Sequence, residues 1–308
     1  MRTRAAAFLF APTADTWLTI LRTGLGLQVG LYCLSLQSSW SALLSGSGGG
    51  IITREFAEAI ITSESRSIPR LGWLIAGGEW LGLSEQTTLT AVWFILLLTA
   101  SCLVAGLFCR ASAIVSWFLY LCVAKSTGVL SYGVDHLTTI GLFYLMLSPL
   151  PDRRALDVQL WKTRTAEAIF HGFFRRLLQL HLCVIYLFGG FAKALGSGWW
   201  DGSNIWRALT RPPFDLLAPE FIVRLAALLP LLGIAVVIVE LAYPFLIWSR
   251  RTRRVWLLLT CGMHLGIGLT MGMYLFALVM IVLNVAAFGP AAAERAPHAA
   301  IPPAPAAV

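Results

Sequence analysis

Residues 89–108 read LTAVWFILLLTASCLVAGLF, twenty consecutive positions without a charged side chain. About 20 apolar residues in a helix, rising 1.5 Å each, cross some 30 Å of hydrocarbon, so this run predicts a transmembrane helix. Further apolar runs that could cross a membrane lie at Trp17–Leu36, Ala111–Val129, Val134–Leu150, Leu177–Leu195, Ile222–Trp248 and Val255–Phe288. The last run is too long for one crossing, and Gly266, Gly268 and Gly272 offer places to break it, so we expect about eight transmembrane helices.

The composition of the whole chain agrees with a membrane protein. Only 12% of the 308 residues are charged and 58% are apolar, against about 25% and 45–50% in soluble proteins. The net charge of +8 does not indicate a nucleic-acid partner, because the arginines stand in short clusters beside the apolar runs rather than on one water-facing surface. We therefore expect an all-α, polytopic transmembrane helical bundle whose surroundings are the lipid membrane.

The arginine clusters also predict the orientation of the bundle. Lys and Arg near short loops mark the cytoplasmic side. If Arg2 and Arg4 lie inside, the basic groups at 110, 153–176 and 250–254 fall inside as well, so we expect both termini to be cytoplasmic. We expect residues 1–288 to form one transmembrane domain and the Ala- and Pro-rich residues 289–308 to be a disordered tail.

Ionisable residues inside the spans are the candidates for function, because a charge at mid-bilayer costs at least about 2.5 kcal/mol. Three of them lie near the ends of their spans, and we expect structural roles in which the side chain reaches the interface. These three are Arg22, Lys125 and His181.

Lys193 lies in the predicted outer part of its span. It shares one helix face with Gly190, Gly189 and Tyr186, which precede it by three, four and seven residues. Two glycines beside a lysine leave space for a flat ligand. The alternative is that Gly189 and Gly190 only allow another helix to pack closely, while Lys193 reaches the outer interface.

Two further pairs of polar residues accompany Lys193. Asp135 and His136 open the fourth span on the same outer side, where a His beside an Asp and near a lysine is typical of an acid–base pair. The alternative is that Asp135 is only a helix cap. Glu240 and His264 each lie ten residues from the arginine cluster 250–254, so they have the same depth on adjacent helices and we expect them to pair. That pair could instead serve only packing.

Motifs of several common enzyme and metal-site classes are missing from the sequence. There is no nucleophile elbow, phosphate-binding loop or dinucleotide fingerprint. The six cysteines stand singly in or at the ends of apolar runs, so no metal site is expected.

Five stretches in order resemble the HTTM (horizontally transferred transmembrane domain) family, which includes the vitamin K-dependent gamma-carboxylase and the bacterial SdpB-type maturation proteins. They are Leu21-Arg22-Thr23-Gly24-Leu25-Gly26; Gly48-Gly49-Gly50-Ile51-Ile52; Gly133-Val134-Asp135-His136 with Ser148-Pro149; Tyr186-Leu187-Phe188-Gly189-Gly190-Phe191-Ala192-Lys193 with Trp200-Asp201-Gly202; and Glu240-Leu241-Ala242-Tyr243-Pro244 with Arg253-Arg254, His264, Met271-Gly272 and Phe276.

The resemblance implies a chemistry for these residues. Lys193 matches the lysine taken as the base that deprotonates vitamin K hydroquinone in the carboxylase, and His136 matches a histidine thought to assist it. It implies a reduced quinone, vitamin K or menaquinol, as cofactor and lyase-type carboxylation as the relatives' activity. Together with the spacing above, it predicts a cofactor site formed by Asp135, Tyr186, Gly189, Gly190, Glu240 and His264. The bacterial cytoplasmic membrane is the expected location.

Two departures from the carboxylase set this chain apart. Ala192 stands where the carboxylase has a second lysine, and, with about twenty residues after the last span, we expect no counterpart of the carboxylase's large lumenal domain. Two hypotheses follow. One is a quinol-dependent oxidoreductase or carboxylase-like enzyme with Lys193 as base. The alternative is a non-enzymatic SdpB-like membrane partner in the maturation or export of a secreted peptide or small protein. A transporter is disfavoured because no inverted repeat is visible.

Overall fold

The computed structural model describes residues 4–46, 53–128 and 131–290, which contain helices and loops but no strand. The expected tail lies almost wholly outside the described residues. The shorter helices are α1 (Arg4–Leu9), α3 (Trp40–Leu44), α4 (Arg54–Glu64), α5 (Leu71–Trp80), α9 (Leu156–Trp161), α11 (Ser197–Trp200), α12 (Ser203–Thr210), α13 (Pro219–Arg224) and the 3-10 turn η2 (Ala226–Leu228). The longer ones are α2 (Thr16–Ser35), α6 (Glu85–Ala105), α7 (Cys109–Ser126), α8 (Gly133–Leu147), α10 (Ala168–Ala194), α14 (Leu229–Leu246), α15 (Arg253–Met271) and α16 (Tyr274–Phe288).

The longer helices occupy the apolar runs of the sequence. Four helical segments in the described chain are long and apolar enough to cross a membrane: Glu85–Ala105, Ala168–Ala194, Ala226–Leu246 and Arg253–Met271. The helices α8 and α16 are apolar but shorter. The prediction of an all-helical, multi-pass membrane protein is confirmed, while the count of eight crossings and the side of the termini stay predictions.

Glycines in the left-handed conformation separate consecutive helices. Gly106, with φ of 79°, ends α6, and its N–H donates to the Cys102 carbonyl at 2.8 Å. Gly272, with φ of 71°, ends α15 and divides the 255–288 run into α15 and α16. A residue with a Cβ is strained in this conformation, which is why glycine stands at both helix ends. Gly266 and Gly268, the other expected break points, lie inside α15.

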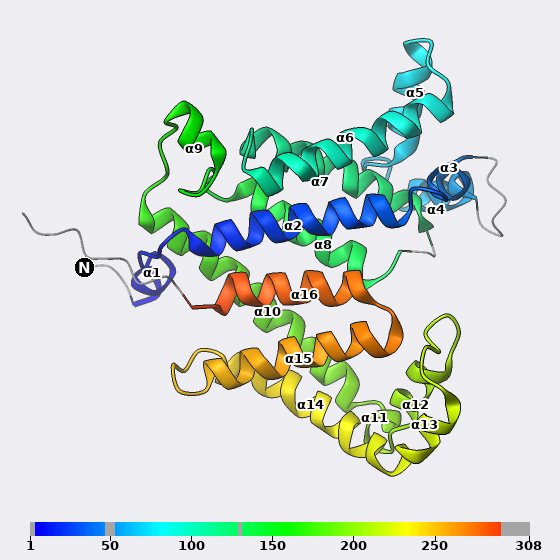
Figure 1. Ribbon diagram of the computed structural model, residues 1–308, viewed down its shortest axis with the longest axis vertical. Coiled ribbons are helices and arrows are strands. Elements are labelled where there is room, and N and C mark those ends of the chain that lie inside the picture. The colour runs from blue at the N-terminus through cyan, green and yellow to red at the C-terminus, as the bar shows by residue number, and fades with distance from the viewer. Residues whose placement is uncertain (1–3, 47–52, 129–130, 291–308) are drawn as a thin grey trace, which may run out of the picture.

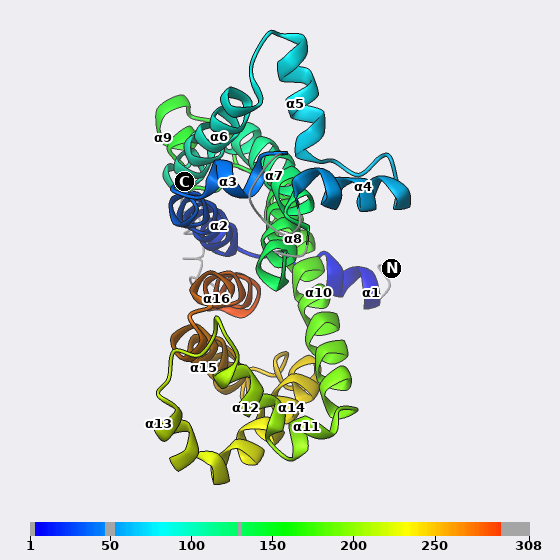
Figure 2. The same cartoon turned by 90° about the vertical axis from the view of Figure 1, so that its right-hand side faces the viewer.

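The bundle has two groups of helices joined by two bridging helices. One group contains α2, α6, α7 and α8, and the other contains α14 and α15 with the short helices α11–α13 (Figure 2). The long α10 runs from the first group to the second, and α16 lies between α2 and α15 (Figures 1 and 2). α1, α9 and the loop between α14 and α15 lie at one end of the bundle, and α3, α4 and α11–α13 lie at the other (Figure 1). The arginine-rich loops therefore share one end.

Helix α2 packs closely between two neighbours through small residues. A Cβ on Gly24 would lie 2.5 Å from the Val282 side chain of α16, and a Cβ on Gly26 would lie 2.9 Å from the Ala100 carbonyl of α6. Glycines at such contacts let helix backbones approach each other in a membrane. The face between them buries Leu21 and Leu25 completely, so α2 is the central helix of the first group.

Two polar residues of the spans have structural partners. The Arg22 Nε donates to Asp152 Oδ2 at 2.6 Å, and the side chains are 2% and 0% exposed. Arg22 also donates to the Leu103 carbonyl at the end of α6. His181 Nδ1 lies 3.0 Å from the Tyr144 hydroxyl of α8. Arg22 thus ties α2 and α6 to the loop after α8, rather than reaching the interface as the sequence suggested.

The segment between α2 and α6 is held to the bundle by a buried carboxylate. Glu58 of α4 accepts hydrogen bonds from Ser126 Oγ of α7 at 2.6 Å and from the Gly72 N–H of α5 at 3.0 Å. Arg54 lies 3.3 Å from Glu58 and 3.0 Å from Glu85. The network joins α4, α5, α6 and α7 at the end of the bundle opposite the arginine-rich loops.

Candidate functional site

The second helix group contains a cavity of about 640 Å³. Residues of α10–α16 line it, and most of the lining side chains are aliphatic, aromatic or methionine. Pockets for small molecules usually have about 300–1,000 Å³ and a mostly apolar wall with a few convergent polar groups. Here the polar groups are Lys193, Glu240, His264 and Thr270.

Lys193 and Glu240 form an ion pair at the wall of this cavity. The Lys193 Nζ donates to Glu240 Oε2 at 2.7 Å, and the two side chains are 25% and 9% exposed. Lys193 belongs to the last turn of α10 and Glu240 to α14. The Lys193 ammonium also lies 5.4 Å from the centre of the Trp199 ring, within the range of a cation–π interaction.

Gly189 and Gly190 make room for this pair. A Cβ on Gly189 would lie 3.3 Å from Glu240 Oε2, and a Cβ on Gly190 would lie 2.9 Å from the Leu241 backbone nitrogen. Helices α10 and α14 therefore approach closely at the level of the pair. Close packing, the structural alternative for the glycines, is present, and it brings the carboxylate to the lysine.

His264 belongs to a separate hydrogen-bond chain behind the pair. Its Nε2 lies 2.9 Å from the Tyr186 hydroxyl, and its Nδ1 is buried without a hydrogen-bond partner. The prediction that Glu240 pairs with His264 is therefore wrong. Equal depth on adjacent helices did not fix the rotation of each side chain, and the carboxylate of Glu240 turns to α10 instead.

The donor and acceptor of each hydrogen bond in this series follow from the groups that can only donate or only accept. Asn284 Nδ2 donates to the Met280 carbonyl and to the Tyr186 hydroxyl oxygen, each at 2.8 Å, and Asn284 Oδ1 accepts from the Tyr243 hydroxyl at 2.8 Å. The hydrogen of Tyr186 is then directed to His264 Nε2, so that a neutral His264 carries its own hydrogen on Nδ1. The rings of Tyr186 and Tyr243 stack with their centres 4.0 Å apart.

The family model for the HTTM domain matches residues 69–290. The chain belongs to the HTTM domain family. The match contains the helices α5–α16 and every lining residue of the cavity, whereas α2 lies before it. No curated protein and no solved structure matches the chain.

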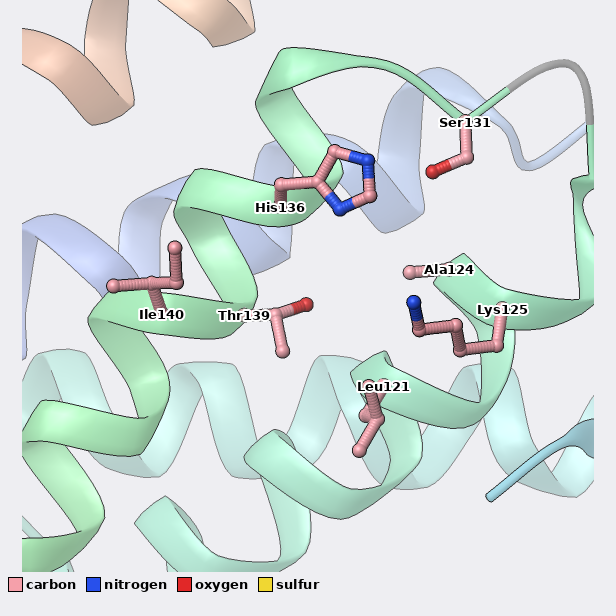
Figure 3. A pocket seen from close by; sticks show the side chains of 7 residues that line it. All are labelled: Leu121, Ala124, Lys125, Ser131, His136, Thr139 and Ile140. Carbon is pink, nitrogen blue, oxygen red and sulfur yellow. The ribbon is translucent and has the colours of Figure 1, made fainter. Parts of the chain in front are cut away.

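His136 of this HTTM domain lies in a different cavity from Lys193. Two adjoining cavities of about 260 and 310 Å³ share Ala124, Lys125, Ser131 and His136 in their walls. Lys125 and His136 come from α7 and α8, and their side chains point toward the same space (Figure 3). The structure therefore does not bring His136 and Lys193 into one site, although both lie at the same end of the bundle.

Asp135 acts as a cap of α8 and a tie to α7. Its Oδ2 accepts from the Tyr132 N–H at 3.0 Å, and its Oδ1 accepts from the Tyr120 hydroxyl at 3.2 Å. A carboxylate that accepts a backbone N–H at a helix N-terminus stabilises the helix end. This is the structural alternative for Asp135, and the residue lines neither the Lys193 cavity nor the His136 cavities.

The Trp200-Asp201-Gly202 stretch of the HTTM domain sets a turn beside the cavity. Asp201 Oδ1 accepts from the Ser203 N–H at 2.8 Å, and this hydrogen bond lowers the pKa of Asp201. Gly202 has φ of 80°, and a Cβ on it would lie 2.5 Å from the Pro230 nitrogen. The stretch therefore fixes α11 and α12 against α14 and has a structural role.

Two side chains of the site, Asn284 and Trp199, were not predicted from the sequence, and a third, Tyr243, stood only in a stretch that carries the resemblance. Asn284 and Tyr243 complete the chain to His264, and Trp199 lies beside Lys193. The sequence could have indicated Asn284, because it is an amide in the otherwise apolar α16, where the structure buries it fully. Within the described part of the chain, no three His, Cys, Asp or Glu side chains gather as metal ligands.

Proposed function

We propose that this HTTM-domain protein binds a reduced quinone in the cavity and removes a proton from a ring hydroxyl with the Lys193–Glu240 pair. The observation that carries the proposal is an ion pair in the wall of a mostly apolar cavity. Ionisable groups in a membrane are expensive and mark functional sites. The bacterial cytoplasmic membrane is the proposed location.

The shape and polarity of the cavity fit an isoprenoid quinone. Its volume of about 640 Å³ is enough for a ring with part of an apolar tail. The helices α12–α15 supply aliphatic and methionine side chains for the tail, and Lys193 and Glu240 supply polar contacts for a ring oxygen. A bound quinol would supply two electrons and two protons to O2, which would leave a quinone and hydrogen peroxide, and loss of its first proton makes its ring electron-rich.

The geometry gives Lys193 and Glu240 different roles in the proton transfer. Because Lys193 donates to Glu240, its nitrogen carries protons, and the carboxylate holds the lone pairs that accept one. We therefore propose that Glu240 takes the hydroxyl proton, while the Lys193 ammonium stabilises the negative charge left beside it. This changes the expectation from the resemblance, in which Lys193 is the base and His136 assists it. The apolar wall excludes water and strengthens the attraction of Lys193 for an anion.

Turnover of a defined quinol tests this proposal. We expect vesicles with the purified protein to oxidise reduced menaquinone-4 in air faster than protein-free vesicles. Glu240→Gln and Lys193→Met should each slow the reaction by about 100-fold or more, which is the usual contribution of a positioned acid–base group.

His136→Ala is the matched control, because it changes an exposed imidazole in another cavity. Oxidation by the native protein that does not exceed that of protein-free vesicles would refute the proposal. The non-enzymatic partner of a secreted peptide would then be the better account.

A further inference from the structure

A second group of polar side chains lies outside the Lys193 cavity, at the end of the bundle where α7 ends and α8 begins (Figure 1). Lys125, Ser131, His136 and Thr139 line one cavity of about 260 Å³. In Figure 3 the Lys125 ammonium, the His136 ring and the two hydroxyl oxygens face the same space. Four groups that can donate hydrogen bonds therefore converge there.

The charges around this space favour an anion. Lys125 makes no ion pair or hydrogen bond with any side chain in the described residues, although it is only partly exposed. Asp135, next to His136, is already bonded to the Tyr132 N–H and the Tyr120 hydroxyl. Glu64 of α4 is an exposed residue in the wall of the adjoining cavity. Lys125, which lines the cavity together with these hydroxyls, thus has no ion-pair partner in the part of the chain that the structure describes.

Along α7 and α8, the polar side chains of this cavity lie at the end of the bundle and the apolar ones lie deeper, an order that matches an amphipathic ligand. Lys125 lies in the last turn of α7 and His136 in the first turn of α8. Leu121 and Ile140 line the same cavity one turn further along their helices, toward the middle of the bundle. One turn is about 5.4 Å, so an anionic head at Lys125 places its apolar part beside these two side chains.

We propose that this cavity binds a phosphate group, with Lys125 as the cation and His136, Ser131 and Thr139 as hydrogen-bond donors. Phosphate presents several acceptor oxygens, and a lysine binds it as a point charge. The apolar wall favours a phospholipid headgroup as its source, and a free phosphate is the other source of the same chemistry. The site is independent of the quinone cavity.

Lipid retention tests the proposal. The protein is placed in nanodiscs of phosphatidylcholine with a small fraction of phosphatidylglycerol, transferred to detergent, and the retained lipid is counted by native mass spectrometry. We expect phosphatidylglycerol to be enriched on the native protein. One lysine near a membrane surface contributes enough attraction for about a fivefold effect, so Lys125→Gln should reduce the enrichment by that factor.

The controls separate charge at this site from charge elsewhere. The Lys125→Arg variant should retain phosphatidylglycerol as the native protein does, and the His136→Gln variant should retain less of it. Lys162→Gln, at the exposed end of α9, should leave its retention unchanged. If millimolar inorganic phosphate displaces the lipid or binds in its absence, the site accepts a free phosphate. Retention that is unchanged by Lys125→Gln and His136→Gln, or no binding of either probe, overturns the proposal.

Discussion

Breaking the Lys193–Glu240 pair should cost more stability than removing it. Lys193→Met leaves the Glu240 carboxylate, 9% exposed, without its cation. Loss of one partner of a buried ion pair costs about 3–5 kcal/mol. Because the Lys193 side chain is 25% exposed, we expect the lower limit, about 3 kcal/mol. Replacing both charges by apolar groups is often neutral. The double variant Lys193→Met with Glu240→Leu should therefore have a free energy of unfolding within about 1 kcal/mol of that of the native protein.

The assay is reversible unfolding in mixed micelles with increasing sodium dodecyl sulfate. Glu240→Leu alone should also cost about 3 kcal/mol, because it leaves the Lys193 ammonium without its carboxylate. With a double variant within about 1 kcal/mol of the native protein, the coupling free energy should be about 5 kcal/mol. The control is Glu55→Gln, whose carboxylate is 72% exposed and 3.9 Å from Arg54. It should change the free energy of unfolding by less than about 0.5 kcal/mol. A double variant as unstable as the sum of the two singles would refute the buried-pair account.

Three further predictions concern other contacts. Arg22→Met leaves Asp152 buried without a cation and should lower the free energy of unfolding by about 3 kcal/mol; a loss below 1 kcal/mol would contradict this. Gly190→Ala should destabilise by about 1–3 kcal/mol because its Cβ meets the α14 backbone, whereas Gly77→Ala, with open space around it, should not; equal effects would disprove the packing argument. Tyr186→Phe should move the hydrogen of the cavity histidine away from Nδ1, measured by ¹⁵N NMR, and an unchanged spectrum would argue against the hydrogen-bond chain.

The sequence predicted the helices well because lipid imposes their length and composition. The apolar runs located the longer helices, and the conformational preference of glycine explained the division of the 255–288 run at Gly272. The helix period also placed Gly189, Gly190 and Lys193 on one face, which is the face that meets α14. These features depend on residues close together in the chain.

The partners of the buried charges could not be predicted in the same way. Depth along the helix suggested Glu240 with His264, but the contact depends on how α10, α14 and α15 rotate against each other. For the same reason Asp152, in a loop, was not recognised as the partner of Arg22. His136 lies at the same end as Lys193, yet α8 packs against α7 and turns it to another cavity.

The central claim is that the cavity beside Lys193 holds a quinone ring, and photoaffinity labelling measures this most directly. The native protein in vesicles is irradiated with an azido-quinone, and the labelled residues are identified by mass spectrometry with and without excess menaquinone-4. The account predicts label on cavity residues such as Trp199 and Met263, and loss of that label under competition. Label confined to residues outside the cavity, or label that menaquinone-4 does not displace, would contradict it.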